Sequence, residues 1–388
     1  MNSKLLLKTW LLFAILMPCL LRAAVLPEDR SDLLYHRYDG GGMVIDGPSL
    51  LVRKSFLDKF SASANYYIDN VSAASIDVLA NASPYIERRK EYSVGLDYLN
   101  NKTTLSTSFT NSTENDYEAN TAFIGVSQDF FGDLSTLSFG YSKGWDTVMK
   151  RGDADFKEFI DRHNFKIDWT QVITKNWIAS IGVNTVTDQG YLNNPYRVVR
   201  YLDPNSGIGF RYQTEVYPET RTSTAVAFRS MYYLPYRAAF KFEMRGFNDT
   251  WDINAKNFEV AYIHPYQDEW IFEAKVRQYT QTEADFYRDL IDPSDNAQNT
   301  EFVARDKEMS AFSNISYGLG VSYEKELHEG GFFKKFAINL NIDYFQFEFD
   351  NFRDVLVHDT QPGQYAVGQE PLYAFDATVT RFFFSIWY

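Results

Sequence analysis

Apolar and polar residues alternate with period two in segments that recur along this 388-residue chain. In "FAINLNIDY" (336–344), the even positions are all apolar and the odd positions are mostly polar. The same pattern recurs in "AFKFEMRG", "WIFEAKVRQY" and "NFKIDWT". Because successive side chains of a strand point to opposite faces, this period indicates strands with one apolar and one polar face. The sequence therefore predicts an all-β fold.

Two features favour a transmembrane barrel over a soluble sandwich, whose half-buried strands also alternate. The apolar faces often begin or end on an aromatic residue such as Tyr92 or Trp270, as expected at membrane interfaces. Short turns also alternate with long polar connections at 188–215, 285–306 and 351–371. We predict a transmembrane antiparallel β-barrel of 14–16 strands, with short periplasmic turns and long extracellular loops.

The strand count depends on the N-terminal region. "SLLVRKSF" (49–56) is also strand-like, and its available partner is "GGMVID" (41–46), turning at Gly47-Pro48. In one interpretation, residues 24–57 form an arm or plug and the barrel has fourteen strands. In the other, which we slightly prefer, a short first hairpin brings the barrel to sixteen strands. We assign 24–48 to this arm, partial plug or first short strand, and 49–388 to the barrel. The fourteen predicted strands are 59–70, 88–99, 103–112, 118–130, 134–148, 157–173, 177–190, 217–234, 237–249, 253–265, 268–283, 306–327, 333–350 and 371–388.

The N-terminus reads as a cleaved signal peptide of residues 1–23. Basic Lys4 and Lys8 precede an apolar run, which ends before the small pair Ala23-Ala24. Cleavage removes the only cysteine and three basic residues, so the net charge goes from −13 to −16. A chain this acidic is a poor partner for nucleic acid. We therefore expect export to the outer membrane of a Gram-negative bacterium.

The chain ends on "RFFFSIWY", with an aromatic face that meets lipid in a last strand. This end resembles the C-terminal insertion signal of bacterial outer-membrane proteins, which implies the barrel-assembly machinery as a partner during insertion. The lipid bilayer and lipopolysaccharide are the other expected partners. The residues of the signal are Phe382, Phe384, Ile386 and Tyr388.

The polar strand faces should line a lumen. Both signs of charge interleave there, so the charges can pair across strands. This predicts either a wet channel of weak selectivity or a lumen cross-linked by ion pairs and plugged. The lumen-lining candidates are Lys241, Glu243 and Arg245, then Glu273, Lys275 and Arg277 two strands along with Glu259 between, and Lys166, Asp168, Asn339, Asn341 and Asp343.

No constellation predicts catalysis or a metal site. The five histidines lack the spacing of a zinc site. His163 lies beside Asp161, but no nucleophile motif accompanies it. We expect no enzyme, no cofactor and no metal. In "YFQFEF" the apolar residues change face at Tyr344–Phe345, which predicts either an aromatic platform above the outer rim or packing between long outer hairpins.

Two N-terminal segments carry a family resemblance. "YHRYDGGGMVIDGPSLLVRKSF" and "YYIDNVSAASID" resemble a family of proteobacterial outer-membrane proteins that carries only a domain-of-unknown-function label. The resemblance implies a barrel. It also implies an association with exported flavin-transfer and thioredoxin-like proteins, and hence an envelope redox context.

Three functions remain open from the sequence. The first is a porin-like transport barrel, which passes or binds a small solute. The second is a structural or docking barrel for an exported partner, such as a redox protein. The third, ranked low, is an outer-membrane hydrolase.

Overall fold

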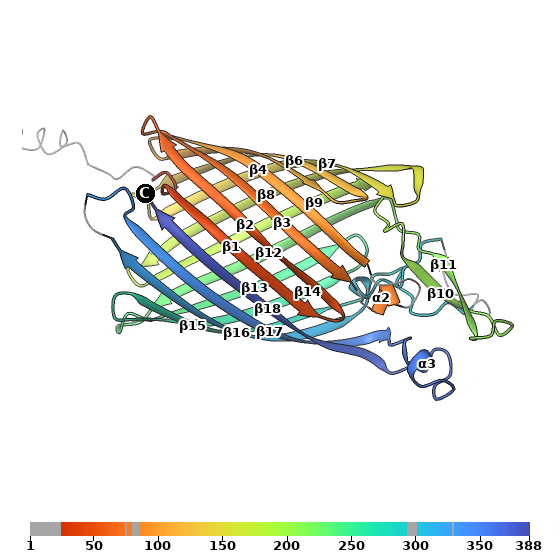
Figure 1. Cartoon of the computed structure of the whole chain (residues 1–388). Helices are drawn as coiled ribbons and strands as arrows, with labels where there is room; N and C mark the ends of the chain where they lie inside the picture. The colour runs from red at the N-terminus through yellow and green to blue at the C-terminus, as the bar shows by residue number, and fades with distance from the viewer. Residues whose placement is uncertain (1–24, 74–75, 80–84, 293–300, 328–329) are drawn as a thin grey trace, which may run out of the picture.

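The computed structural model describes residues 25–73, 76–79, 85–292, 301–327 and 330–388, so the predicted signal peptide (1–23) lies outside the described residues. Sixteen antiparallel strands form a closed barrel, which confirms the predicted fold class (Figure 1). None of the described helices is long and apolar enough to cross a membrane. The barrel strands are β1 (Arg30–Gly40), β2 (Met43–Phe56), β3 (Phe60–Ala73), β4 (Tyr85–Asn100), β5 (Thr103–Thr113), β6 (Tyr117–Phe130), β7 (Ser135–Lys150), β8 (Asp153–Thr174), β9 (Trp177–Gly190), β12 (Thr220–Tyr233), β13 (Ala239–Asp249), β14 (Asn254–Tyr266), β15 (Trp270–Gln281), β16 (Phe312–Glu326), β17 (Lys335–Arg353) and β18 (Leu372–Trp387).

The first hairpin differs from the predicted one. Residues 41–46 do not form a separate strand that turns at Gly47-Pro48, because Met43–Phe56 is continuous as β2 and its partner is β1. The turn lies at Gly41 and Gly42, whose φ angles of 57° and 76° suit a tight hairpin and are easy for glycine. Gly47 and Pro48 interrupt only the pairing with β3, since proline has no N–H to donate.

The barrel closes through β1 and β18, which pair along all 11 residues of β1. On β18, Phe382, Phe384 and Ile386 share the outward face, and Phe382 is 40% exposed. The hydroxyl of Tyr388 donates to the carbonyl of Arg53 at 2.9 Å, beyond the end of the strand. The aromatic C-terminal residues thus lie at the seam where the two ends of the chain meet.

The two faces of the sheet follow the predicted alternation. On β15, Phe272 and Val276 point outward to lipid and are 45% and 46% exposed. The intervening Glu273, Lys275 and Arg277 point into the lumen. The aromatic residues predicted at the membrane interfaces, such as Tyr92, also lie on the outward face.

Inward glycines let ion pairs lie flat against the barrel wall. Lys275 on β15 reaches Asp343 on β17 with Nζ and Oδ1 2.9 Å apart, and Gly318 of β16 lies between them in register. Arg381 of β18 also bonds Asp343. A Cβ atom at Gly318 would overlap both Asp343 and the Lys275 side chain. These charges therefore pair along the wall of the barrel.

The two ends of the barrel differ. One end carries turns of a few residues, the start of β1 and the C-terminus (Figure 1). The other carries a loop lobe, which we define as residues 191–219, 282–292, 301–311 and 354–371. The lobe contains a two-stranded sheet of β10 (Val198–Leu202) and β11 (Phe210–Thr214), the 3-10 turn η1 (Lys307–Met309) and the short helix α3 (Val357–Thr360). A further short helix, α2 (Ile76–Leu79), follows β3 at the same end.

The glycine at the Lys275–Asp343 pair gives a first testable prediction. Gly318→Ala should destabilise the barrel by about 1–3 kcal/mol, because the added methyl group overpacks the wall and displaces the pair. Gly246→Ala is the matched control, since a Cβ atom there meets nothing within 4 Å. Urea unfolding in lipid vesicles measures the stability of both variants. Equal urea midpoints for Gly318→Ala and Gly246→Ala would contradict the prediction.

Candidate solute site in the barrel lumen

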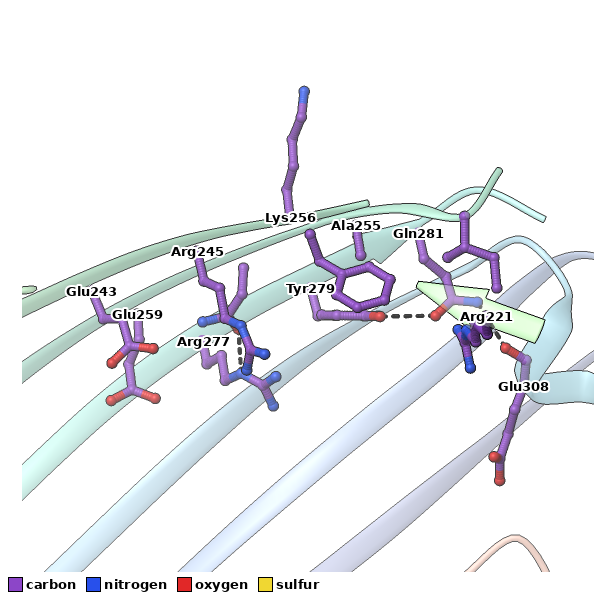
Figure 2. A pocket seen from close by; sticks show the side chains of 13 residues that line it. Arg221, Glu243, Arg245, Ala255, Lys256, Glu259, Arg277, Tyr279, Gln281 and Glu308 are labelled. Carbon is purple, nitrogen blue, oxygen red and sulfur yellow. Dashed lines mark hydrogen bonds between the residues drawn. The ribbon is translucent and has the colours of Figure 1, made fainter. Parts of the chain in front are cut away.

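A cavity of about 390 Å³ lies on the inner wall of β12–β15, next to the loop lobe. Figure 2 shows its lining side chains projecting from neighbouring strands, with Lys256 pointing away from the others. The lining combines charges of both signs with aromatic and amide groups. Its residues are Arg221, Glu243, Arg245, Phe247, Ile253, Ala255, Lys256, Asn257, Glu259, Arg277, Tyr279, Gln281 and Glu308.

Three arginines face the cavity, and their partners differ. Arg221 is held by the Asp249 carboxylate, with Nη2 and Oδ2 2.6 Å apart, and its guanidinium lies 4.4 Å from the centroid of the Trp251 ring. Arg277 donates to the amide oxygen of Asn257, which is a neutral partner. Arg245 has no hydrogen bond or ion pair to any residue that the structure describes, although it lies directly opposite Asn257. Arg277 lies directly opposite Glu259 of β14 in register, but neither Arg245 nor Arg277 forms an ion pair with a described residue.

Two carboxylates form the other side of the cavity (Figure 2). Glu243 on β13 and Glu259 on β14 are directly opposite each other in register. Like charges in such a pair repel. Arg229 compensates Glu243, with Nε and Oε2 2.8 Å apart. Glu259 has no ion-pair partner among the described residues, although Arg277 of β15 lies directly opposite it in register.

The other predicted lumen residues also lie on inward faces, outside this cavity. Lys241 and Glu273 approach to 3.8 Å across the small, covered Ala261. Lys166 and Asp168 pair on β8 at 2.9 Å. Asn339 and Asn341 point inward from β17, with Asp343 next to them on the same face.

Sequence reasoning missed Arg221 and Glu308, which line the cavity, and Arg229 and Trp251, which contact its lining residues. Arg221 and Arg229 share the inward parity of β12, so the alternation in "TRTSTAVAFRS" contained the signal. Glu308 and Trp251 belong to connections between strands, where alternation gives no guidance.

The change of face in "YFQFEF" does not come from a β-bulge at Tyr344–Phe345. The register of β17 is continuous through Tyr344 and Phe345, so no bulge occurs there, and the irregularity lies between Glu348 and Arg353. Phe345 and Phe349 continue the inward face of Asp343. They therefore do not form a platform above the rim: Phe349 packs inside the mouth against Phe312, Phe352 and Tyr373.

The loop lobe has its own buried ion network. Arg200 and Glu370 are both fully buried, and Arg200 bonds Glu370 at 2.5 Å and Asp289 at 2.6 Å. His358 Nε2 lies 2.8 Å from Glu370 Oε1. Burial alone raises the pKa of Glu370, but the Arg200 guanidinium and the His358 hydrogen bond outweigh it and lower the pKa to about 2. The network ties β10 to residues 170 positions away.

Contacts from the lobe and neighbouring loops reach across the mouth of the barrel. Ile76 of α2 belongs to the same buried cluster as Trp251, and these residues come from connections on opposite sides of the barrel. Tyr196 donates to the Asp116 carboxylate at 2.6 Å and accepts from the Arg151 backbone N–H at 2.7 Å. The long-loop mouth is therefore narrowed by packed loops.

An acidic group lies at the rim on the wall opposite the cavity. Carboxylate oxygens of Glu87, Glu114 and Asp116 all lie within 4.8 Å of one another. Burial and then the neighbouring Glu87 raise the pKa of Glu114. Tyr196 already occupies one oxygen of Asp116. Arg89 lies 4.0 Å from Glu114, and we assign the group no metal.

The structure gives no support to the hydrolase alternative at His163. Its side chain lies on the outward face of β8, and Nδ1 is 2.8 Å from the Tyr141 hydroxyl. The neighbouring Asp161 pairs with Lys143 at 3.3 Å.

The fold and the cavity define a transmembrane barrel with a polar, mixed-charge lumen. The sequence profile of one family, described as "Protein of unknown function (DUF3570)", matches residues 20–357. The chain belongs to this family, which confirms the resemblance of its N-terminal segments. No curated protein matches the chain by sequence.

Several solved structures are similar at low identity. A bacterial polysaccharide outer membrane secretin is 9% identical with a TM-score of 0.48, over 93% of this chain and 99% of that one. CdiB from Acinetobacter baumannii is 9% identical with a TM-score of 0.48, over 94% of this chain and 60% of CdiB. The siderophore receptor PirA from Pseudomonas aeruginosa is 7% identical with a TM-score of 0.43, over 84% of this chain and 57% of the receptor's length. Likenesses at this level carry no information on what the protein does.

The buried network predicts that the lobe opens without Arg200. Arg200→Met should lower the stability of the lobe by about 3–5 kcal/mol, because it leaves the buried Glu370 carboxylate without its main partner. Arg211→Met is the matched control, since Arg211 forms an exposed pair with Asp203 on the same hairpin, worth about 0–1 kcal/mol. Limited proteolysis of the lobe should be much faster for Arg200→Met alone, and equal rates would refute this role.

The lowered pKa of Glu370 predicts acid opening of the lobe. The ionised carboxylate stabilises the lobe at pH values above its ordinary pKa of 4.5, and this contribution is lost as the pH falls toward about 2. Pepsin cleavage of the lobe should therefore accelerate between pH 4.5 and 2.5. Glu370→Gln cannot titrate and should lose this pH dependence. A wild-type profile as flat as that of the variant would contradict the assignment.

Proposed function

We propose that this protein is an integral outer-membrane barrel, whose lumen binds small polar solutes and lets them cross the membrane. The observation that carries the proposal is the cavity on β12–β15, where Arg245, Arg277 and Glu259 present charges that no described ion pair neutralises. Charged groups without ion-pair partners in a watery lumen are available to a solute.

The form of the lumen supports passage of solutes. A barrel of sixteen strands is wide enough for an aqueous path, and the Lys275–Asp343 pair beside Gly318 lies along its wall. The packed lobe narrows the long-loop mouth, which favours small solutes over large ones.

We also propose an orientation and a lipid partner. The long-loop end faces the cell exterior and the short turns face the periplasm, as in other outer-membrane barrels. Arg88 and Lys90 then stand on the outward face of β4 near the exterior side, exposed and without an ion-pair partner among the described residues. Two such cations suit the phosphate groups of lipopolysaccharide. The C-terminal face of Phe382, Phe384, Ile386 and Tyr388 then serves as the insertion signal.

Solute entry into proteoliposomes tests the proposal. Vesicles that contain the refolded protein should swell in glycine or a dipeptide several-fold faster than empty vesicles, and little in a trisaccharide. Arg200→Met should raise this size limit because it loosens the lobe, and Arg211→Met should leave it unchanged. A barrel that is folded by its heat-modifiable gel mobility, and yet admits none of the solutes, would refute the proposal.

A further inference from the structure

We propose that the cavity on β12–β15 selects small zwitterionic solutes that carry one carboxylate and one ammonium group, as amino acids and short peptides do. This inference rests on the proposed function and names its class of solute. The cavity has two poles of opposite charge, and each pole contains a charged side chain that no described partner neutralises.

Arg245 and Arg277 form the pole for a carboxylate. Arg277 donates to the neutral oxygen of Asn257, which orients its guanidinium, and it forms no described ion pair with Glu259, the residue opposite it in register. Arg245 lies opposite the same Asn257 in register and is exposed to the lumen. A planar guanidinium binds a carboxylate through two parallel hydrogen bonds, so two adjacent ones hold it in a defined orientation. Arg221 is already occupied by Asp249.

Glu259 and Glu243 form the pole for an ammonium group. They face each other in register, and Arg229 compensates Glu243 alone. Arg277 lies opposite Glu259 on its other side without an ion pair, and a cation bound between the two carboxylates lowers their repulsion further. An ammonium group provides both the charge and the hydrogen-bond donors for this position.

Aromatic and amide groups border the carboxylate pole (Figure 2). The Arg277 guanidinium lies 5.7 Å from the centroid of the Tyr279 ring, whose hydroxyl donates to Gln281 at 2.8 Å. Phe247 adds apolar surface to the lining. The cavity volume of about 390 Å³ lies at the low end of ligand sites, which span roughly 300–1,000 Å³. A side chain of modest size therefore has room beside the two charged groups.

Solutes with a single charge fit this arrangement less well. A simple anion is attracted by the two arginines but repelled by the two glutamates. A simple cation is attracted by the glutamates but repelled by the arginines. A zwitterion satisfies both poles at once, so the lining disfavours its singly charged analogues. The cavity therefore distinguishes a zwitterion from singly charged solutes by the positions of its two charged poles, and not by the net charge of the lumen.

Three matched probes test the inference: glycylglycine as the zwitterion, N-acetylglycine as the anion and glycinamide as the cation. Vesicle swelling reports entry, and saturation-transfer NMR on the refolded protein reports binding. We expect glycylglycine to enter and bind several-fold better than either analogue. Arg245→Gln should reduce the entry and binding of glycylglycine and N-acetylglycine but leave those of glycinamide unchanged. Glu259→Gln should reduce the entry and binding of glycylglycine and glycinamide but leave those of N-acetylglycine unchanged. Arg211→Gln, which changes an exposed arginine of the lobe outside the cavity, is the control and should match the wild type.

The outcomes separate the two proposals. Equal behaviour of the three probes, or a preference for either singly charged probe, overturns the zwitterion inference and leaves solute passage standing. Selective binding of glycylglycine without entry supports the inference and contradicts passage. Neither binding nor entry of any probe overturns both. Heat-modifiable mobility of each variant shows that the barrel is folded.

Discussion

The constraint on which this structure depends is the pairing of every backbone N–H and C=O group within hydrocarbon, where no water is available. A β-sheet meets it only by closing on itself, and here the closure is the pairing of β1 with β18 along the whole of β1. Closure fixes which residues face lipid and which face the lumen. The period-two pattern of the sequence follows directly from it.

The same constraint concentrates polar chemistry in the lumen. Apolar residues occupy the outward face, so charged residues gather on the inner wall, where they must find partners or water. Most do so along the wall, as Lys275 and Asp343 do across Gly318. The cavity on β12–β15 differs because Asn257 occupies the place of a carboxylate between Arg245 and Arg277. In the function that we propose, this arrangement leaves charge available for a solute at the point where the lobe narrows the mouth.

Alternation predicted the barrel and most strand bounds, because the pattern is local. It also predicted the inward parity of the charged residues on β13 and β15. It placed the start of β16 at 306, whereas the strand begins at Phe312, because residues 306–311 belong to the lobe. The Arg200–Glu370 pair and the cluster of Ile76 with Trp251 join distant loops. Such contacts depend on how the loops pack over the closed barrel, and no local pattern encodes them.

The central claim is that the lumen is a water-filled path narrowed by the loop lobe. Single-channel recording of the refolded protein in a planar bilayer tests it most directly. The account predicts discrete conductance steps with weak preference between cations and anions, because charges of both signs line the wall. A folded, inserted barrel that conducts no current at any applied voltage would contradict it.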